Sequence, residues 1–270
     1  MPTTAPRDGV AIHYEIHGDG TPLLLISGTG HDLGFWAGQL PFFTPEFRTI
    51  VFDNRGIGGS SVPAPGYSLA DMADDAAHLL DDAGIGSAHV MGFSMGGHIA
   101  QELALNHPYR VLSLGIHHSW TRNGARLKKF QETRRYLAEH DQRVALTELS
   151  MLALHASAYY DDHADEMETH RRFLLEQSPV NAGWIGQLDA CINGDTYDRL
   201  PQINVPTQIT CSELDVIAAP HLSRMIHERI AGSTLHILQG TGHVALMEAP
   251  EEFAALCLEF LRSVTVTKTP

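Results

Sequence analysis

The chain has 270 residues, of which 43% are hydrophobic and 19% charged, and its formal net charge is −14. These values predict a globular protein with a well-buried core, built as one large domain or as one domain with an insertion. The acidic balance, without any Lys- and Arg-rich run, argues against nucleic acid as a partner. The sequence shows no signal peptide and no stretch that predicts a membrane span, so we expect a cytoplasmic protein.

Seven short segments have the character of β-strands. The first alternates apolar and polar residues, which indicates a half-exposed strand. The later ones are nearly continuous runs rich in Val, Ile and Leu, as in a parallel sheet covered on both faces. The predicted strands are Val10–Ile16, Leu23–Ile26, Thr49–Phe52, His89–Phe93, Val111–Ile116, Pro206–Cys211 and Leu235–Leu238.

Helical segments separate these strands, and the clearest is 68–83. Ser68 can accept hydrogen bonds from the first backbone amides, and Asp71 lies near the positive end of the helix. Gly84 can take up the left-handed conformation that ends a helix. Strands that alternate with helices predict an α/β architecture with a mostly parallel sheet.

The alternation stops between residues 119 and 200, where no strand is predicted. The segments Arg126–Glu139, Ala145–His155 and Glu166–Glu176 have helical character instead. We therefore expect a core formed by residues 1–118 and 201–270, and a helical lid formed by residues 119–200. Such an insertion can cover the ends of the strands, where ligands of open α/β sheets bind.

The motif Gly92-Phe93-Ser94-Met95-Gly96 follows a predicted strand and precedes a predicted helix. G-x-S-x-G in this context is the nucleophile elbow, a sharp turn that exposes the serine hydroxyl. Glycines flank the serine because side chains there would crowd the turn. The alternative, a Gly- and Ser-rich turn without chemistry, is disfavoured by the placement between strand and helix.

A serine hydroxyl needs a neighbouring base to act as a nucleophile. The chain has 17 histidines, so position must select one. His243 lies in a loop after the last predicted strand and before a helix, which favours it. His118 follows a strand in the middle of the chain, and His98 falls inside the helix after the serine.

The third member of a catalytic triad orients the imidazole and stabilises its protonated form. Asp215 follows the predicted strand 206–211, and the order Ser94, Asp215, His243 is the one expected when the serine lies in a nucleophile elbow between strand and helix. Glu213 and Asp195 are weaker candidates for this acid.

Acyl transfer also needs hydrogen-bond donors for the oxygen that gains negative charge. One expected donor is the backbone amide of Met95, directly after the nucleophile. The small-residue loop Ser27–Gly30 follows an early strand, and we expect the second donor to be the amide of Thr29. A plain glycine turn is the alternative for this loop.

Two further segments complete a resemblance that covers nearly the whole chain. Asp53–Ser60 resembles the D-x-R-G-x-G-x-S loop of the α/β-hydrolase family, and Gly242–Pro250 is similar to that family's region around its histidine. The resemblance implies an α/β-hydrolase fold, with a mostly parallel central sheet, helices on both faces and a helical lid insertion. It also implies structural roles for Asp53 and Arg55.

Within this family, the segment Ile26–Trp36 looks most like that of small catabolic hydrolases. These include 3-oxoadipate enol-lactonases and aminoacrylate-hydrolase-like proteins. Many family members have His-Gly where this chain has Ser27-Gly28. Similar epoxide hydrolases and haloalkane dehalogenases carry an aspartate in place of Ser94, and C–C bond hydrolases often have Trp in place of Val244, so these three activities are disfavoured.

The predicted reaction is hydrolysis of an ester, lactone or activated amide of a small molecule, without a metal or an organic cofactor. Substrate contacts are expected from the insertion. Trp120, Phe173 and Trp184 are candidates for an apolar pocket, and Arg122 and Arg126 for binding a carboxylate. The alternatives are aromatic residues that pack the insertion onto the core and arginines exposed to solvent.

Three other functions stay open at this point. A C–C bond hydrolase of ring-cleavage products and a perhydrolase are the enzymatic alternatives, and a ligand-binding receptor on a hydrolase fold is the third. A homodimer is compatible with the chain. Cys191, Cys211 and Cys257 match no metal or disulfide spacing, so we expect three small buried residues.

Overall fold

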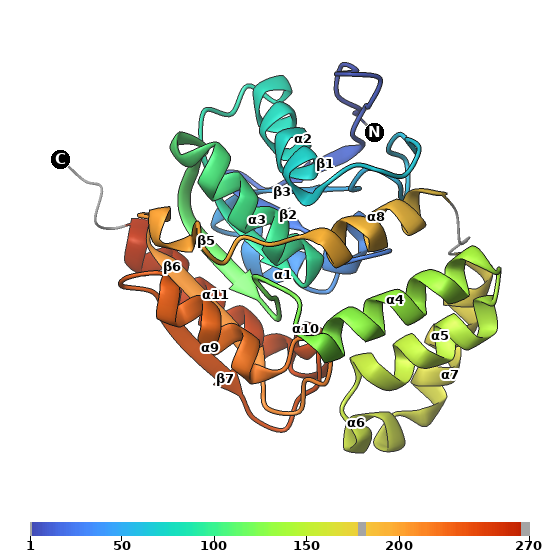
Figure 1. The fold of residues 1–270 in the computed structure, drawn as a ribbon. Helices are drawn as coiled ribbons and strands as arrows, with labels where there is room; N and C mark the ends of the chain where they lie inside the picture. The colour runs from blue at the N-terminus through green and yellow to red at the C-terminus, as the bar shows by residue number, and fades with distance from the viewer. Residues whose placement is uncertain (1, 178–181, 266–270) are drawn as a thin grey trace.

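The computed structural model describes residues 2–177 and 182–265, and its centre is a sheet in the order β1-β3-β2-β4-β5-β6-β7 (Figure 1). β1 runs antiparallel to β3, and the other neighbours are parallel. The strands are β1 (Tyr14–His17), β2 (Thr21–Ile26), β3 (Phe47–Phe52), β4 (Ala88–Phe93), β5 (Val111–His117), β6 (Thr207–Ser212) and β7 (Thr234–Leu238).

All seven predicted strand segments overlap an observed strand, and the first is the least accurate. A strand was expected from Val10, but β1 begins at Tyr14. Tyr14 pairs with Phe52, the last residue of β3, so residues before Tyr14 extend past the end of the partner strand. There the chain forms only isolated bridges, including one between Arg7 and Val10.

Helices cover both faces of the sheet, as expected. Leu24 and Ile26 of β2 belong to a core cluster that also contains residues of α2, α3 and α9, whereas Leu23 and Leu25 belong to a second cluster with α1 and α11. The alternation of side chains along β2 therefore connects two layers of helices. These helices are α1 (Leu40–Phe43), α2 (Leu69–Asp82), α3 (Met95–Asn106), α9 (Pro220–Arg229) and α11 (Pro250–Thr265).

Short helical turns complete the core. They are η1 (Leu33–Trp36), η2 (Pro108–Arg110), η3 (Leu200–Gln202) and α10 (Ala245–Glu248).

The predicted start of α2 is confirmed, because Ser68 and Asp71 form a reciprocal capping box. The Asp53 carboxylate accepts from the backbone amides of Leu33 and Gly59, at 2.7 and 2.8 Å, and thereby joins two loops at the edge of the sheet.

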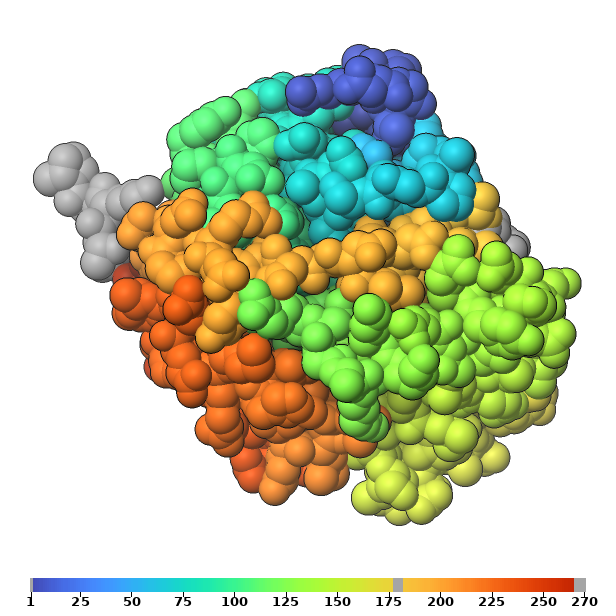
Figure 2. Space-filling model, viewed as in Figure 1, coloured from blue at the N-terminus to red at the C-terminus, as the bar shows by residue number. Residues whose placement is uncertain are grey.

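In the described part of the chain, five α-helices lie between β5 and β6, and Figures 1 and 2 show α4 to α7 as a lobe beside the sheet. They are α4 (Ala125–Glu139), α5 (Arg143–Leu154), α6 (Ser157–Asp162), α7 (Ala164–Gln177) and α8 (Ala182–Asn193). The predicted helices match α4, α5 and α7 to within a few residues, and α6 and α8 were not predicted. No helix within the described ranges combines the length and apolarity needed to cross a membrane.

Helix α8 lies between this lobe and the core. Its Gly183 touches Gly56 so closely that a Cβ atom at Gly183 would lie 2.2 Å from the Gly56 Cα atom. The Tyr67 hydroxyl donates to the Gly183 carbonyl at 2.6 Å. These contacts hold the start of α8 against the loop after β3.

Candidate active site

Ser94 lies at the turn between β4 and α3, with φ 55° and ψ −117°. The two flanking glycines have no room for side chains. A Cβ atom at Gly92 would lie 2.0 Å from the Gly96 carbonyl oxygen, and one at Gly96 would lie 2.1 Å from the Ile26 carbonyl oxygen. The turn therefore has the sharp geometry that the sequence motif predicts, with the serine at the start of a helix.

Two loops at the same end of the sheet bring His243 and Asp215 to Ser94. The His243 Nε2 atom lies 3.0 Å from the Ser94 Oγ atom, and its Nδ1 atom lies 2.7 Å from the Asp215 Oδ2 atom. The three residues are buried, with exposed fractions of 9% for Ser94, 3% for Asp215 and 2% for His243. This is the arrangement of a nucleophile, a base and an orienting acid.

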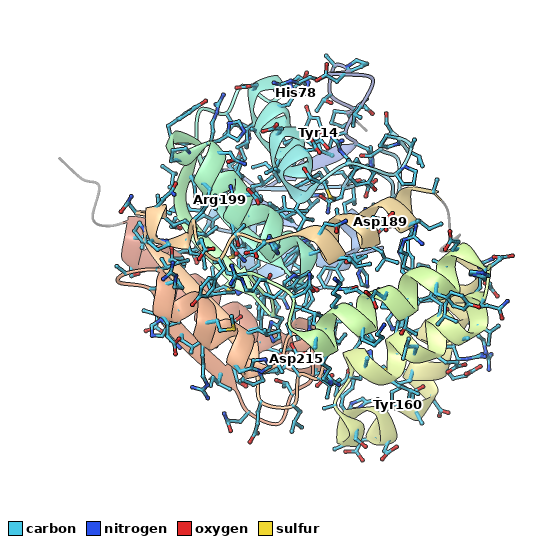
Figure 3. All side chains as sticks on the ribbon, viewed as in Figure 1. Tyr14, His78, Tyr160, Asp189, Arg199 and Asp215 are labelled. Atoms are coloured by element: carbon cyan, nitrogen blue, oxygen red, sulfur yellow. The ribbon has the colours of Figure 1, made fainter. Side chains whose placement is uncertain are left out.

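The Asp215 carboxylate has the environment of an ionised group. Burial alone would raise its pKa, but the charge and hydrogen bond of His243 hold the pKa below its ordinary value. The other carboxylate oxygen accepts from the backbone amides of Ile217 and Ala218, at 2.8 and 2.9 Å. Figure 3 labels Asp215 near the end of β6, where the core meets the lobe.

The other predicted candidates for the base and the acid lie elsewhere. His118 is buried behind His243, where it stacks on Phe93 and its Nε2 atom lies 2.8 Å from the Ser212 hydroxyl. Glu213 accepts from the Gly240 amide, and Asp195 pairs with Arg122. Asp215 is therefore the predicted acid that contacts His243.

The loop that carries His243 is fixed by a buried carboxylate. Glu248 accepts from the backbone amides of Gly242, at 2.7 Å, and Ala156, at 3.0 Å. Its carboxylate lies 3.3 Å from the Nδ1 atom of His155, which is also buried. Burial favours a raised pKa for Glu248, yet these partners lower it below the ordinary value. An ionised Glu248 thus joins the His243 loop to the end of α5.

Two backbone amides near Ser94 are available as donors. Gly28 lies against the nucleophile, since a Cβ atom there would come within 3.3 Å of the Ser94 Cβ atom, and Thr29 follows it. Across residues 2–177 and 182–265, neither the Thr29 amide nor the Met95 amide donates a hydrogen bond. Two unpaired donors beside a nucleophile can bind a developing oxyanion.

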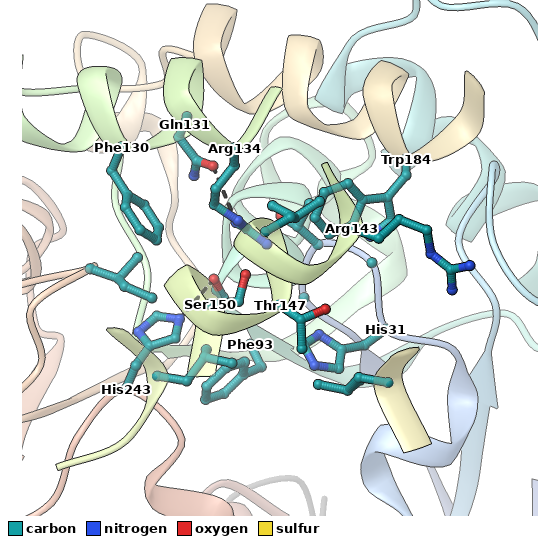
Figure 4. Close-up of a pocket in the computed structure, with 18 residues that line it drawn as sticks. His31, Phe93, Phe130, Gln131, Arg134, Arg143, Thr147, Ser150, Trp184 and His243 are labelled. Carbon is teal, nitrogen blue, oxygen red and sulfur yellow. Dashed lines mark hydrogen bonds between the residues drawn. The ribbon is translucent and has the colours of Figure 1, made fainter. Parts of the chain in front are cut away.

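A cavity opens above Ser94 between the core and the lobe (Figure 4). One side is formed by the loop after β2, by Ser94 and by His243. The opposite side is formed by side chains of α4, α5 and α8. Its apolar lining includes Phe93, Phe130, Leu146, Leu154, Trp184 and Ile217.

Comparison with known proteins identifies the family. The model of the α/β-hydrolase fold family matches residues 21–250. The chain belongs to the α/β-hydrolase family. A relative from Azorhizobium caulinodans named "Putative carbamate hydrolase RutD" is 30% identical over 92% of this chain and 94% of its own length. One of the same name from a Caulobacter species is 29% identical over 93% and 95%.

Solved structures agree with this assignment. An enol-lactonase from Burkholderia xenovorans superposes on this α/β-hydrolase with a TM-score of 0.89 over 97% of the chain and 100% of its own; at 24% identity, this likeness shows the fold alone. A thermophilic esterase from Thermogutta terrifontis is 28% identical, with a TM-score of 0.86 over 97% of both chains. The named relatives are hydrolases, which supports a hydrolase enzyme.

One of the three aromatic residues predicted to contact the substrate of this α/β-hydrolase lies in the cavity. Trp184 of α8 lines it. Trp120 does not, because it is fully buried in the main core cluster beside the ring of His98. Phe173 is 55% exposed on α7 and lies outside the cavity. The expectation for Trp120 and Phe173 is corrected, since one packs inside the core and the other faces solvent.

The two arginines expected to bind a carboxylate also lie outside the cavity. Arg122 pairs with Asp195 and Asp198, and its guanidinium group lies over the ring of Tyr197. Arg126 donates to the carbonyl of Val216. Both side chains are occupied by partners outside the cavity, which agrees with the alternative of surface arginines and not with carboxylate binding in the cavity.

Sequence reasoning missed the polar residues that do line the cavity. They are His31 in the loop after β2, Gln131 and Arg134 on α4, and Arg143, Thr147 and Ser150 on α5. The spacing of Gln131 and Arg134, and of Thr147 and Ser150, places each pair on one helix face. That spacing was visible in the sequence, but it does not say which face meets the cavity.

The three cysteines are free and buried, as expected. Within the described part of the chain, no group of three or more His, Cys, Asp or Glu side chains could hold a metal ion.

Proposed function

We propose that the protein is a serine hydrolase that cleaves an ester, lactone or activated amide of a small molecule through an acyl-enzyme. The observation that carries the proposal is the continuous chain of contacts from Ser94 through His243 to Asp215. A hydrogen on His243 Nδ1 donates to Asp215, which leaves Nε2 free to accept the Ser94 proton.

In the first half of the reaction, Ser94 Oγ attacks the carbonyl carbon while His243 takes the hydroxyl proton. The oxygen of the tetrahedral intermediate accepts hydrogen bonds from the amides of Thr29 and Met95. The ionised Asp215 stabilises the imidazolium ion that forms. His243 then protonates the leaving group, and an ester of Ser94 remains.

In the second half, His243 removes a proton from a water molecule, which attacks the acyl carbon. The same two amides bind the second oxyanion. Collapse of this intermediate returns the proton to Ser94 and releases the acid. Each step uses groups whose positions are held by buried hydrogen bonds, so little reorganisation is needed during the reaction.

We further propose that residues 119–200 act as a lid on a core of residues 1–118 and 201–270. Phe130 of α4, Leu146 of α5 and Trp184 of α8 face Ser94 and His243 across the cavity. A substrate bound at Ser94 would therefore contact both parts. Shape and polarity of the lid side chains would select the substrate, while the core would supply the chemistry.

The names of the relatives suggest which substrates to test first. They include a carbamate hydrolase, an enol-lactonase and an esterase. All three bond types place a leaving oxygen or nitrogen on a carbonyl carbon, which the proposed mechanism can attack. We propose the same range for this chain, with a small acyl group.

A fluorophosphonate probe tests the nucleophile directly, because it labels serines activated by a neighbouring base. We expect labelling of the wild type at Ser94, none in Ser94→Ala, and parallel loss of p-nitrophenyl acetate hydrolysis. A folded wild type that is neither labelled nor active would favour a binding protein. Faster turnover of a ring-cleavage dienoate than of any ester would favour the C–C hydrolase.

A further inference from the structure

The charge of the cavity differs from that of the whole protein. The chain has 32 acidic residues against 18 Lys and Arg residues. Among the described residues that line the cavity, however, two are arginines, Arg134 and Arg143, and none is Asp or Glu. The cavity is therefore a local cationic site in an acidic protein.

Arg134 has no carboxylate partner among the described residues. Within the described ranges, it donates a long hydrogen bond of 3.3 Å to the Gln131 side chain, and its buried Nε atom has no acceptor. Nearby arginines differ, since Arg135 on the same helix pairs with Asp189 and Glu139.

Aromatic rings hold the Arg134 guanidinium group in place. It lies 5.5 Å from the ring centroid of Phe130 and 5.1 Å from that of Trp184. Figure 4 shows the side chain extending from α4 into the cavity, toward Thr147 and Ser150 of α5. Such packing restricts the group without neutralising it. Arg143, in contrast, donates to the Leu175 carbonyl.

Burial lowers the pKa of Arg134 to about 10, so the group stays protonated at neutral pH. A partly desolvated cation without a counter-ion is costly, and an anionic ligand would offset that cost. The planar guanidinium fork matches a carboxylate, which can accept two parallel hydrogen bonds.

We propose that Arg134 binds a carboxylate of the substrate, so that the preferred substrates are small esters, lactones or activated amides that carry a second, anionic group. This inference rests on the proposed hydrolase function, which it narrows to one substrate class. The apolar lining leaves room for a short hydrocarbon body between the carboxylate and the reacting carbonyl. Thr147 and Ser150 offer hydroxyl donors beside the same group.

A matched pair of substrates tests the proposal. Monomethyl succinate carries a carboxylate, and methyl succinamate replaces it with a neutral amide of the same shape. We expect the wild type to hydrolyse the anionic ester with a kcat/KM at least about tenfold higher. Equal kcat/KM for the two esters would overturn the proposal and leave the hydrolase function intact.

Substitutions of Arg134 and of a control arginine test which residue causes the preference for the anionic ester. Arg134→Gln is expected to lower kcat/KM for the anionic ester by about 10- to 100-fold, mainly through KM, and to change the neutral ester by less than about threefold. Arg126→Gln removes an arginine from the same helix outside the cavity and should leave both values unchanged. An Arg134→Gln loss of equal size on both esters would contradict anion recognition.

A binding measurement on inactive variants tests the carboxylate site independently of the proposed hydrolase function. Succinate is titrated calorimetrically into Ser94→Ala, and into Ser94→Ala combined with Arg134→Gln. Binding that weakens at least about tenfold in the double variant supports the carboxylate site even if neither ester is hydrolysed. Absence of succinate binding, at a succinate concentration about 50 times a millimolar Kd, overturns the carboxylate site.

Should Arg134→Gln fail to fold, Arg134→Lys replaces it. This variant keeps the charge but loses the planar fork, so a loss of about 3- to 10-fold confined to the anionic ester is expected. No loss with Lys, together with equal turnover of the two esters by the wild type, would contradict the proposal.

Discussion

The two sides of the cavity are built differently. The side with Ser94, Asp215 and His243 belongs to a sheet with two large core clusters, and its polar groups are buried and bonded to one another. Helices α4, α5 and α8 share a small cluster with three buried members, and the lobe displays large exposed hydrophobic residues such as Leu152 and Phe173. Under the proposed function, the catalytic groups lie on the more densely packed part and the groups that select the substrate on the more lightly packed part.

The largest effect is expected from removing the side chain proposed as the base. His243→Ala removes the group that lies 3.0 Å from Ser94, and kcat for a reactive ester should fall on the order of a million-fold. The midpoint of thermal unfolding serves as the control for folding. Retention of more than about one hundredth of wild-type kcat would show that His243 is not the base.

Substitution of the proposed acid should lower kcat less than substitution of the proposed base, but more than substitution of any residue in the lobe. Asp215→Asn keeps the shape of the side chain but favours the wrong imidazole tautomer, and an expected loss in kcat is on the order of ten-thousand-fold. The pH profile of kcat/KM provides the readout. A kcat of the variant within about tenfold of the wild-type value would mean that another residue is the acid.

Acid should destabilise the core through its buried histidines. Burial lowers the pKa of His31, His98, His117 and His118 to about 3. In the unfolded chain each binds a proton near pH 6.5, whereas in the folded protein each stays neutral. The unfolded state then binds more protons between pH 6.5 and 3, so the free energy of unfolding decreases as pH falls through that window.

His98 allows this effect to be measured at one site. Both of its ring nitrogens lack hydrogen-bond partners within the described residues, and its ring packs against Trp120. His98→Leu should reduce the slope of unfolding free energy against pH by about 1.4 kcal/mol per pH unit below pH 6.5. Urea unfolding at several pH values gives the slope, and an unchanged slope would contradict a neutral buried His98.

The smallest expected effect comes from the contact between lobe and core. Gly183→Ala would force α8 away from Gly56 and should cost about 1–3 kcal/mol in the free energy of unfolding. Since Trp184 follows directly, we expect KM to change by a factor of about three and kcat to stay nearly constant. Gly124→Ala is the control, because a Cβ atom there meets nothing within 4 Å. A larger change in kcat than in KM would mean that α8 also supports the chemistry.

The sequence by itself determined the parts of this protein that depend on local structure. The strand pattern predicted the sheet, and the elbow around Ser94 was predictable because a side chain at Gly92 would meet the Gly96 backbone within the same turn. The places of Ser94, Asp215 and His243 after predicted strands, together with their chain order, predicted that they would meet, since strand ends of a parallel sheet converge at one edge.

Only the tertiary structure decided which side chains face the cavity. Arg122 and Arg134 are close in sequence, yet the first pairs with Asp195, more than 70 residues away, and the second points toward Ser94's cavity without a carboxylate. Trp120 and Trp184 were both candidates for the pocket, yet Trp120 packs in the core and Trp184 lines the cavity, a difference that residue type alone could not predict. The physical reason is that helix periodicity fixes a face, whereas long-range packing fixes what that face touches.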